Sequence, residues 1–203
     1  MPEPYGPDYF ERGVQSGVSL YENYHWMPEA TCAMAMAMID YLPILPDEQV
    51  LDFGCAKGYL VRALRILRRR AWGMDCSLYA IASADQDTWP FLFYGDLPGP
   101  AKWDWIICND ILEHVAGIED LLQTLRISAR RIFAVVPLGD GARFIIPDYD
   151  ADATHLWKRP APWWDDQFQK AGFEVERFSC AVPGIKERWT RKYPKGNGFW
   201  VLK

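Results

Sequence analysis

The stretch "VLDFGCAKGYL", residues 50–60, carries an apolar segment into an acidic residue and then into two glycines. The apolar part has the pattern of a buried strand, with Asp52 near its carboxyl end. A helical pattern with leucines on one face begins after Gly58. A buried strand that breaks on Gly-x-x-x-Gly before a helix is typical of a segment that holds a ligand beyond the edge of a sheet.

The spacing of this stretch excludes two phosphate-binding motifs. A dinucleotide-binding loop needs Gly-x-Gly-x-x-Gly, whereas Cys55, Ala56 and Lys57 separate the two glycines here. A P-loop needs Gly-x-x-x-x-Gly-Lys-Ser/Thr, which the stretch does not contain either. Since Asp52 adds a negative charge at the end of the strand, the stretch favours a ligand with cationic groups over a diphosphate.

The composition is that of one intracellular domain. The chain has 203 residues, of which 50% are hydrophobic, enough for one full core. It has no apolar run of about 18 residues and no amino-terminal signal pattern, so we expect neither a membrane span nor export. The 5 cysteines are widely spaced without a Cys-x-x-Cys pair, which argues against disulfides and a zinc site. We therefore expect a cytoplasmic protein with no metal site and no membrane partner.

Strand and helix patterns alternate along most of the chain. Apolar segments that predict strands lie at residues 48–53, 71–75, 90–96, 103–110 and 131–137, and two more close the sequence at 174–180 and 198–203. Amphipathic patterns that predict helices lie at 57–70, 77–85, 118–129 and 162–173, and Ser77 is placed to cap the second of them. Such alternation predicts an α/β fold with a mainly parallel sheet and helices on both faces.

Two segments lie outside this alternation. Residues 1–46 form an arm rich in aromatic residues that ends in a helical pattern at 28–42, and we expect them to be a lid within the same domain as residues 47–203. Residues 138–160 form an insert after the fifth predicted strand. Because that connection starts at the carboxyl edge of the sheet, the insert is placed to roof a ligand site there.

Acidic residues end three successive predicted strands, at Asp52, Asp75 and Asp96. The carboxyl ends of parallel strands meet at one edge of a sheet, so we expect these carboxylates to share a pocket. Asp75 is placed to accept hydrogen bonds from both hydroxyls of a ribose, and Asp96 to reach an adenine amino group. The set predicts a pocket for a nucleoside that carries positive charge, although each acid taken alone is more often a helix or turn cap.

These residues give the sequence a resemblance to the class I S-adenosylmethionine-dependent methyltransferases over residues 48–137. "VLDFGCAKGYL" is similar to their glycine-rich first motif, with Ala56 in place of the middle glycine, "GMDCS" to their second-strand motif and "GDL" to their adenine-contacting motif. "WDWIICNDILEHV" resembles the fourth-strand motif of the small "LEHV"-type members. The resemblance implies a Rossmann-like seven-stranded, mostly parallel sheet with an antiparallel last strand. It also implies S-adenosyl-L-methionine as cofactor and S-adenosyl-L-homocysteine as product.

The resemblance further implies which residues of this sequence contact the cofactor. Residues of the glycine-rich stretch would surround its methionine part, those after the second and third strands its ribose and adenine, and Asn109 its donor methyl end. The implied set is Asp52, Gly54, Cys55, Ala56, Gly58, Asp75, Cys76, Asp96, Leu97 and Asn109.

Two histidines are candidates for a catalytic base. Methyl transfer from a sulfonium requires mainly alignment and exclusion of water, and a base is needed only for a hydroxyl or a protonated amine. His155 in the insert and His114 after the fourth strand are the candidates, because histidine accepts a proton near neutral pH. The alternative is that His114 packs on the start of its helix and that His155 orders the insert through a backbone hydrogen bond.

Aromatic residues supply the candidate contacts to a methyl acceptor. Tyr21, Tyr24 and Trp26 of the arm, together with Tyr149 of the insert, are candidates to stack on a planar acceptor or to line its pocket. Ordinary packing of the core and of the lid is the alternative interpretation of the same residues.

The charge pattern favours one class of acceptor and leaves others open. A net charge of -5 gives no general attraction to nucleic acid, so a small molecule methylated on oxygen or nitrogen is favoured. Two basic segments, residues 65–70 and 186–196, make a nucleic acid or a protein the alternative, because the second interleaves Trp189 and Tyr193 with its basic residues. A non-catalytic, cofactor-binding partner subunit is a further hypothesis.

Overall fold

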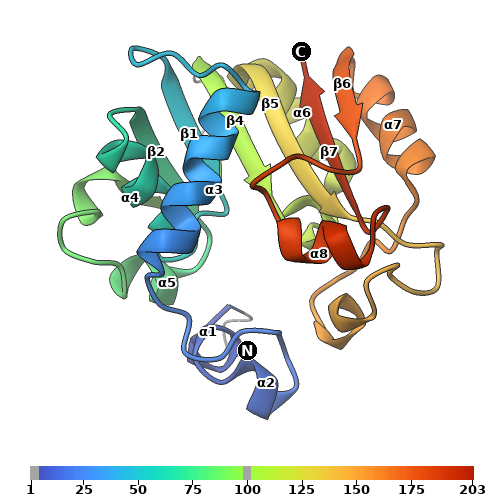
Figure 1. Cartoon of the computed structure of the whole chain (residues 1–203), viewed down its shortest axis with the longest axis horizontal. Helices are drawn as coiled ribbons and strands as arrows, with labels where there is room; N and C mark the ends of the chain where they lie inside the picture. The colour runs from blue at the N-terminus through green and yellow to red at the C-terminus, as the bar shows by residue number, and fades with distance from the viewer. Residues whose placement is uncertain (1–4, 98–101) are drawn as a thin grey trace.

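The computed structural model describes residues 5–97 and 102–203, and its centre is one seven-stranded sheet (Figure 1). The strand order is β3-β2-β1-β4-β5-β7-β6. β1 to β5 run parallel, and β7 runs antiparallel between β5 and β6, which confirms the fold class predicted from the sequence. The strands are β1 (Gln49–Phe53), β2 (Arg70–Asp75), β3 (Leu92–Tyr94), β4 (Trp103–Asn109), β5 (Ala129–Pro137), β6 (Val175–Ser179) and β7 (Asn197–Leu202).

The direction in which the strands are added reverses between β1 and β4. From β1 the chain passes outward to β2 and β3 and then returns to β4 on the other side of β1. Because the connections from neighbouring strands leave toward opposite sides at this point, a crevice opens beyond the carboxyl ends of β1 and β4. Open α/β sheets bind their ligands at this position.

Helices cover both faces of the sheet, and the strands between them are buried. Ile107 of β4 belongs to the hydrophobic cluster under α3 and α4, and Ile106 belongs to the cluster under α6 and α7. Both side chains are fully buried, as expected for a strand covered on both faces. The longer helices are α3 (Pro28–Tyr41), α4 (Tyr59–Ile66), α5 (Leu78–Ala82), α6 (Ile118–Ser128), α7 (Ala161–Lys170) and α8 (Glu187–Lys192), and single turns of 3-10 helix are η1 (Trp89–Phe91), η2 (Leu112–His114) and η3 (Pro147–Ala151).

Local signals set the ends of several helices. Ser77 precedes α5, and its Oγ accepts a hydrogen bond from the Ala80 N–H at 2.9 Å, which is the cap predicted from the sequence. Pro28 occupies the first turn of α3, where its missing N–H has no helical partner to lose. α8 is not predicted from the sequence and lies within the basic segment 186–196. In the described parts of the chain, no helix has the length and apolar character needed to cross a membrane.

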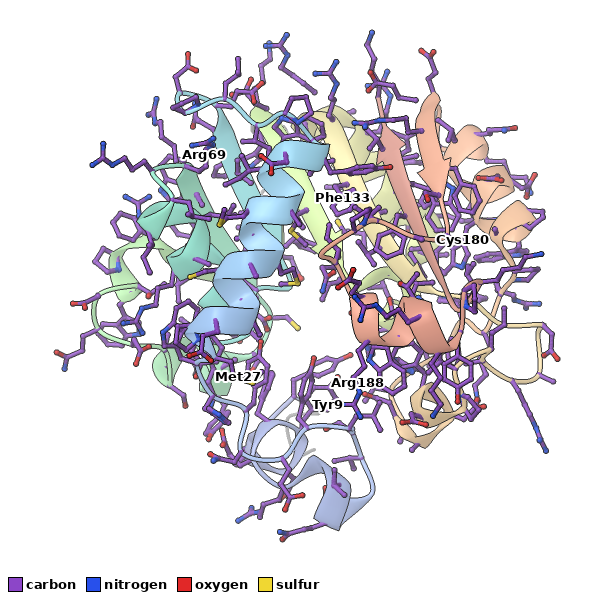
Figure 2. The ribbon with its side chains drawn as sticks, viewed as in Figure 1. Tyr9, Met27, Arg69, Phe133, Cys180 and Arg188 are labelled. Atoms are coloured by element: carbon purple, nitrogen blue, oxygen red, sulfur yellow. The ribbon has the colours of Figure 1, made fainter. Side chains whose placement is uncertain are left out.

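The arm and the insert meet at the carboxyl edge of the sheet. The arm holds two short helices, α1 (Pro7–Phe10) and α2 (Gly13–Ser16), which Figure 1 shows beyond the ends of the parallel strands. Tyr9 of α1 lies between the arm and the rest of the molecule (Figure 2), and its hydroxyl donates to Asp152 Oδ2 of the insert at 3.2 Å. The two segments outside the strand and helix alternation therefore contact each other.

Candidate active site

A cavity of about 470 Å³ lies beyond the carboxyl ends of β1, β2 and β4. Its volume falls within the range of about 300 to 1,000 Å³ that is usual for small-molecule sites. The sheet lines one side of it with acids and with the glycine-rich loop, and the arm lines the other side with aromatic rings. Most residues predicted to contact the cofactor line this cavity, namely Asp52, Gly54, Cys55, Ala56, Asp75, Cys76, Asp96 and Asn109.

Two residues of the predicted cofactor set, Gly58 and Leu97, are not among the described residues that line the cavity. Gly58 precedes α4 with a φ of +74°, and a Cβ there would lie 2.8 Å from Leu92 Cδ2. Its missing side chain therefore lets the loop pack against β3 rather than against a ligand. Leu97 packs against the hydrophobic cluster under α6 and α7. Both residues shape the loops around the cavity.

Asp52 is a buried acid at the carboxyl end of β1, with 5% of its surface exposed. Burial, with a contribution from the nearby charge of Asp75, raises the pKa of the Asp52 carboxyl to about 7. The ammonium group of Lys57, in the loop beside it, does not balance this acid, because it pairs with Glu11 at 2.6 Å. This part of the cavity therefore favours a ligand that brings a positive charge.

Asp75 ends β2 and joins two loops. Its carboxylate accepts hydrogen bonds from the backbone N–H groups of Ala56 and Ser77, both at 2.7 Å. The first bond holds the glycine-rich loop against β2, and the second fixes the turn into α5. Asp75 thus acts as the turn cap that was one interpretation of the sequence, and it also lines the cavity.

The glycine-rich loop takes a backbone conformation that glycine favours. Gly54 has a φ of +78°, and a Cβ at this position would lie 2.0 Å from Ile111 Cδ1. Ile111 follows β4, so the loops after β1 and β4 approach closely only because residue 54 has no side chain. Ala56 has a φ of +49°, a left-handed conformation that a glycine would adopt without strain.

Asn109 ends β4 and lines the cavity, and its side chain holds an unpaired acceptor that is covered by the protein. Its Nδ2 donates to Asp110 Oδ2 at 3.3 Å, whereas its Oδ1 is buried with no hydrogen-bond partner among the described residues. A buried acceptor without a donor costs about 1 to 3 kcal/mol. A ligand in the cavity could satisfy this acceptor only after the side chain turns toward the cavity.

Lys57 joins the glycine-rich loop to the arm. Its Nζ donates to Glu11 Oε1 at 2.6 Å and to the Tyr24 carbonyl at 2.7 Å, and the Tyr79 hydroxyl donates to the same Glu11 oxygen at 2.9 Å. Partial burial acts to raise the pKa of Glu11, but the hydrogen bonds from Lys57 and Tyr79 hold it below its usual value. No local sequence pattern predicts these contacts, because their partners lie far apart in the chain.

Aromatic rings of the arm form the side of the cavity opposite the sheet. Tyr21 and Tyr24, both predicted to contact an acceptor, are among them, with ring centroids 4.8 Å apart. Burial raises the pKa of the Tyr21 hydroxyl above its usual value, so this group stays protonated at neutral pH. Tyr5, Tyr9 and Phe10 line the cavity beside them and were not singled out as acceptor contacts from the sequence.

The other two residues that were predicted to contact a methyl acceptor are not among the described residues that line the cavity. They are Trp26 and Tyr149. Trp26 packs under the guanidinium group of Arg62, which lies 4.9 Å from the ring centroid. Tyr149 belongs to a separate buried cluster in the insert, together with Phe144. Packing, which was the alternative interpretation of the aromatic residues, describes these two positions.

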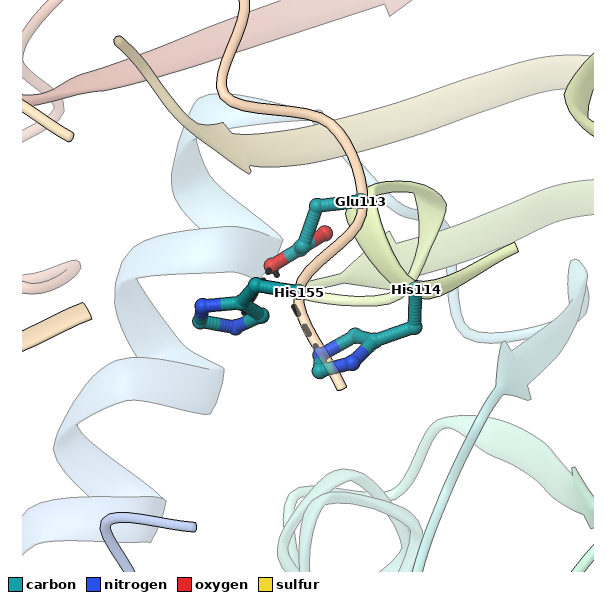
Figure 3. A group of neighbouring side chains, drawn as sticks. All are labelled: Glu113, His114 and His155. Carbon is teal, nitrogen blue, oxygen red and sulfur yellow. Dashed lines mark ion pairs between the residues drawn. The ribbon is translucent and has the colours of Figure 1, made fainter. Parts of the chain in front are cut away.

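The two candidate bases lie side by side, with ring centroids 4.5 Å apart. His114 lines the cavity, and burial together with the neighbouring His155 lowers its pKa to about 4, so its ring is neutral at physiological pH. His155 is not among the described lining residues, and its Nδ1 lies 2.7 Å from the Tyr149 carbonyl, the backbone bond that was the alternative for this residue. One carboxyl oxygen of Glu113, Oε1, faces both rings, at 4.0 Å from His114 Nε2 and 3.9 Å from His155 Nε2 (Figure 3).

The basic segment 186–196 turns its key residues toward the protein. Lys186 pairs with Asp110, and its Nζ also contacts the Tyr149 hydroxyl at 2.9 Å. Burial opposes the charge of Lys186, but Asp110 raises its pKa above the usual value. Trp189 and Tyr193 pack against the same insert cluster as Tyr149. The aromatic residues that suggested stacking on a nucleic acid therefore contact the chain itself.

The strand order, with a crevice between β1 and β4 and acids at its edge, defines the Rossmann-like methyltransferase fold. A family model described as a methyltransferase domain matches residues 25–177, about three quarters of the sequence. The chain belongs to this methyltransferase family. Its cofactor is S-adenosyl-L-methionine, as the sequence motifs implied.

Three solved structures illustrate the likeness in fold. An S-adenosylmethionine-dependent methyltransferase from Archaeoglobus fulgidus has a TM-score of 0.63 at 14% identity, covering 85% of this chain and 94% of its own. A Haloferax volcanii protein of the methyltransferase class, in complex with the Trm112 methyltransferase activator, has a TM-score of 0.62 at 17% identity, covering 88% and 98%. The mitomycin 7-O-methyltransferase MmcR has a TM-score of 0.63 at 15% identity, covering 86% and 53%. No protein of curated function matches the sequence significantly.

The residues at the cavity fit this cofactor. S-adenosylmethionine carries positive charge on its sulfur and on its amino group, and the cavity presents Asp52 without a balancing cation from the adjacent loop. Asn109 lines the same cavity. The glycine-rich loop, held against β2 by Asp75, leaves its backbone at the cavity wall.

Proposed function

We propose that this protein transfers a methyl group from S-adenosyl-L-methionine to an oxygen or nitrogen atom of a small-molecule acceptor. The observation that carries the proposal is a single cavity of about 470 Å³ that joins the acids at the strand ends to the tyrosines of the arm. The acids suit the cofactor, and the aromatic rings suit a planar or apolar acceptor. A nucleic acid would instead need an open basic groove.

The sheet side of the cavity holds the cofactor in this proposal. Asp52 attracts its cationic end, Asp75 accepts hydrogen bonds from the ribose, and Asp96 contacts the adenine. Asn109 lies near the donor methyl end, where its side chain turns to accept a hydrogen bond from the ligand. When bound, the cofactor supplies an activated methyl group on a sulfonium whose thioether leaves readily. The remaining contacts come from Gly54, Cys55, Ala56 and Cys76, while Gly58 and Leu97 keep the loops in shape.

The arm side of the cavity selects the acceptor. Tyr21 and Tyr24 contact it directly, while Trp26 and Tyr149 support these contacts from outside the cavity. Residues 1–46 act as a lid of the same domain, and the insert 138–160 closes the roof through the bond between Tyr9 and Asp152. This arrangement aligns the acceptor and excludes water, which is most of what methyl transfer requires.

A base role for His155 and His114 stays a prediction. Of the two, only His114 borders the cavity, so only His114 is placed to contact an acceptor. His155 would act through its neighbour. An acceptor that is already nucleophilic needs neither residue as a base.

A non-catalytic partner subunit is the second candidate function. The Haloferax volcanii neighbour, a methyltransferase-class protein in complex with an activator, supports only the part of this hypothesis in which a chain of this fold works with a partner. A nucleic acid or protein acceptor has less support, because Lys186, Trp189 and Tyr193 of the basic segment contact the chain itself. The two functions differ in whether the isolated chain transfers a methyl group.

Calorimetric titration with S-adenosylhomocysteine, beside NAD as a control ligand, tests the cofactor site. We expect binding of S-adenosylhomocysteine and none of NAD. Asp52→Asn weakens that binding, whereas Asp47→Asn, a matched change at an exposed acid before β1, leaves it unchanged. A folded protein that binds neither ligand would contradict the proposal.

Methyl transfer from labelled S-adenosylmethionine then tests the acceptor. The panel contains phenols, catechols, hydroxy acids and amines, with bulk transfer RNA and a protein extract beside them. We expect transfer to at least one small molecule. Transfer only to the RNA or the protein would overturn the acceptor class, and tight cofactor binding without any transfer would favour the partner subunit.

A further inference from the structure

Three polar side chains converge behind the wall of the cavity. Glu113 and His114 belong to the single turn η2, and His155 comes from the insert (Figure 3). One ligand atom from each of these residues lies within 4.8 Å of the others. Glu113 Oε1 is 4.0 Å from His114 Nε2 and 3.9 Å from His155 Nε2. These two separations are too long for hydrogen bonds.

The separations are close to those of atoms that bind one metal ion. Nitrogen and oxygen ligands lie about 2.0 to 2.2 Å from a zinc ion, so two ligand atoms of a tetrahedral zinc ion lie about 3.3 to 3.6 Å apart. The distances from Glu113 Oε1 to the two Nε2 atoms, 4.0 and 3.9 Å, exceed this spacing by about 0.5 Å. Binding of an ion therefore requires the three side chains to draw slightly closer together.

The buried carboxyl group of Glu113 is the first indication of a cation-binding site. Its side chain has 0% exposure, and neither carboxyl oxygen has a hydrogen-bond partner among the described residues. An unpartnered buried carboxylate is costly, and proteins satisfy such groups by pairing them or by coordinating a metal. A proton on Glu113 would not bridge the distance to either histidine, whereas a cation between the three groups would contact all of them.

The hydrogen bonds of the two imidazoles supply the second sign. His155 Nδ1 lies 2.7 Å from the Tyr149 carbonyl, which only accepts, so Nδ1 carries the proton. His114 Nδ1 lies 2.8 Å from Thr154 Oγ1, which donates its own proton to Asp152 Oδ1 at 2.5 Å and therefore accepts from His114. In the neutral rings both Nε2 atoms then present lone pairs to the same carboxylate oxygen.

We propose that Glu113, His114 and His155 bind one divalent transition-metal ion, with Zn²⁺ as the first ion to test. Two imidazole nitrogens and one carboxylate oxygen suit this class, whereas Mg²⁺ and Ca²⁺ prefer oxygen ligands alone. Three protein ligands leave a further coordination position open. Since His114 also lines the cavity, that site adjoins the space proposed for the acceptor.

The groups around the three ligands support the assignment. The Nδ1–H of each histidine donates a hydrogen bond to an oxygen, an arrangement that typically orients metal-binding histidines. Lys186 pairs with Asp110 rather than with Glu113, so the carboxylate of Glu113 stays available to a cation. The expectation of no metal site rested on cysteine spacing, and these ligands contain no cysteine.

Metal binding by the full chain, purified without a histidine tag and treated with a chelator, tests the proposal. Titration of Zn²⁺ against a chromophoric chelator should give one ion per chain. Glu113→Gln and His155→Gln should each weaken binding on the order of 100-fold, and Thr154→Val by about 10- to 100-fold through the orientation of His114. Glu119→Gln and His25→Gln, matched changes at exposed or unrelated positions, should leave it unchanged.

Cobalt absorption identifies the ligand atoms in the same protein. Co²⁺ bound by nitrogen and oxygen gives weak visible bands, whereas binding to the free cysteines adds intense thiolate bands in the near ultraviolet. Circular dichroism shows whether each variant folds. If Glu113→Gln does not fold, the His155→Gln variant tests the proposal in its place. Three results would each overturn the proposal. They are no stoichiometric binding of metal, the appearance of thiolate bands, and variants that bind the metal as tightly as the natural protein. S-adenosylhomocysteine binding by the metal-free protein is measured separately, so the two proposals can fail independently.

Discussion

The two sides of the cavity are held by different kinds of interaction. The sheet side, made by the loops after β1, β2 and β4, rests on fully buried strands and on backbone bonds to Asp75. The arm side rests on polar contacts between distant segments, among them Lys57 with Glu11 and Tyr9 with Asp152, and on a small cluster around Tyr9, Phe10 and Ala80. The sheet side cannot move without loss of the main core, whereas the arm side can open by breaking these bonds and uncovering only the small cluster.

The difference teaches how one cavity can both fix and admit its ligands. A fixed cofactor requires rigid positions, and the carboxyl edge of a buried sheet provides them. An acceptor must enter and leave, so a cover with low local stability suits it. The variants below disturb the two sides separately.

The largest effect is expected at Gly54 on the sheet side. Gly54→Val places a side chain against Ile111 in a left-handed backbone conformation, at a cost of about 2 to 5 kcal/mol. We expect a lower unfolding temperature and loss of S-adenosylhomocysteine binding. Gly117→Val is the matched control, because a Cβ there meets open space. A Gly54→Val protein that binds as well as the control would show that the loop is not rigid.

A large effect that depends on pH is expected at Asp52. Its pKa of about 7 means that the carboxyl is neutral at pH 5.5 and ionised at pH 8, so a cationic ligand binds more tightly as pH rises. Calorimetry should show S-adenosylhomocysteine bound roughly tenfold more weakly at pH 5.5 than at pH 8. Asp52→Asn should remove this dependence. A natural protein with flat affinity over this range would contradict the assignment.

The same pKa sets the sign of the effect of Asp52 on stability. Because the folded pKa lies above the unfolded value of 3.8, the folded state holds this proton more tightly. The contribution of this proton to the free energy of unfolding is therefore fully present below pH 4 and is lost as pH rises from about 4 to 7. Chemical unfolding of the natural protein and of Asp52→Asn over this range measures it as a difference between the two curves.

A moderate effect confined to the arm is expected at Glu11. Glu11→Gln removes the charge that pairs with Lys57, which weakens this contact by about 1 to 2 kcal/mol. Limited proteolysis should cut the arm several times faster, and the Michaelis constant for the acceptor should rise, while cofactor binding, which is coupled to the arm through Lys57, weakens less. Asp8→Asn, in the exposed pair with Arg12, is the control. Equal weakening of cofactor binding would mean that the two sides are not separable.

The smallest effect is expected on the outer face of α8. Arg188→Ala and Arg191→Ala remove exposed charges from the basic segment without touching Lys186. For a small-molecule acceptor, the rate of methyl transfer should change by less than a factor of two. A large loss of rate that depends on salt concentration would instead support a nucleic acid acceptor.

The sheet side could be predicted from the sequence because its residues lie in short contiguous patterns. Asp52, Asp75 and Ser77 each stand at the end of a predicted strand or the start of a predicted helix, and the parallel topology brings such ends together. Position alone does not determine contact, however. Gly58 and Leu97 belong to the same motifs, yet their neighbours are Leu92 and the core under α6 and α7.

The arm side and the histidine cluster could not be predicted in this way, because long-range packing creates them. Lys57 meets Glu11 from a distant segment, and Glu113 meets His155 only where the insert returns over η2. Lys186 was interpreted as part of a basic surface from its charged neighbours, but a buried pair with Asp110 turns it inward. Pattern and spacing carry no information on such partners.

Lys57 belongs to the loop between Gly54 and Gly58, and it also holds the arm. A ligand that settles against this loop therefore stabilises the anchor of the arm without touching the arm itself. We expect the kinetics to follow a compulsory order, in which the methyl donor binds before the acceptor. Under that order S-adenosylhomocysteine leaves last, and it inhibits competitively with respect to the donor.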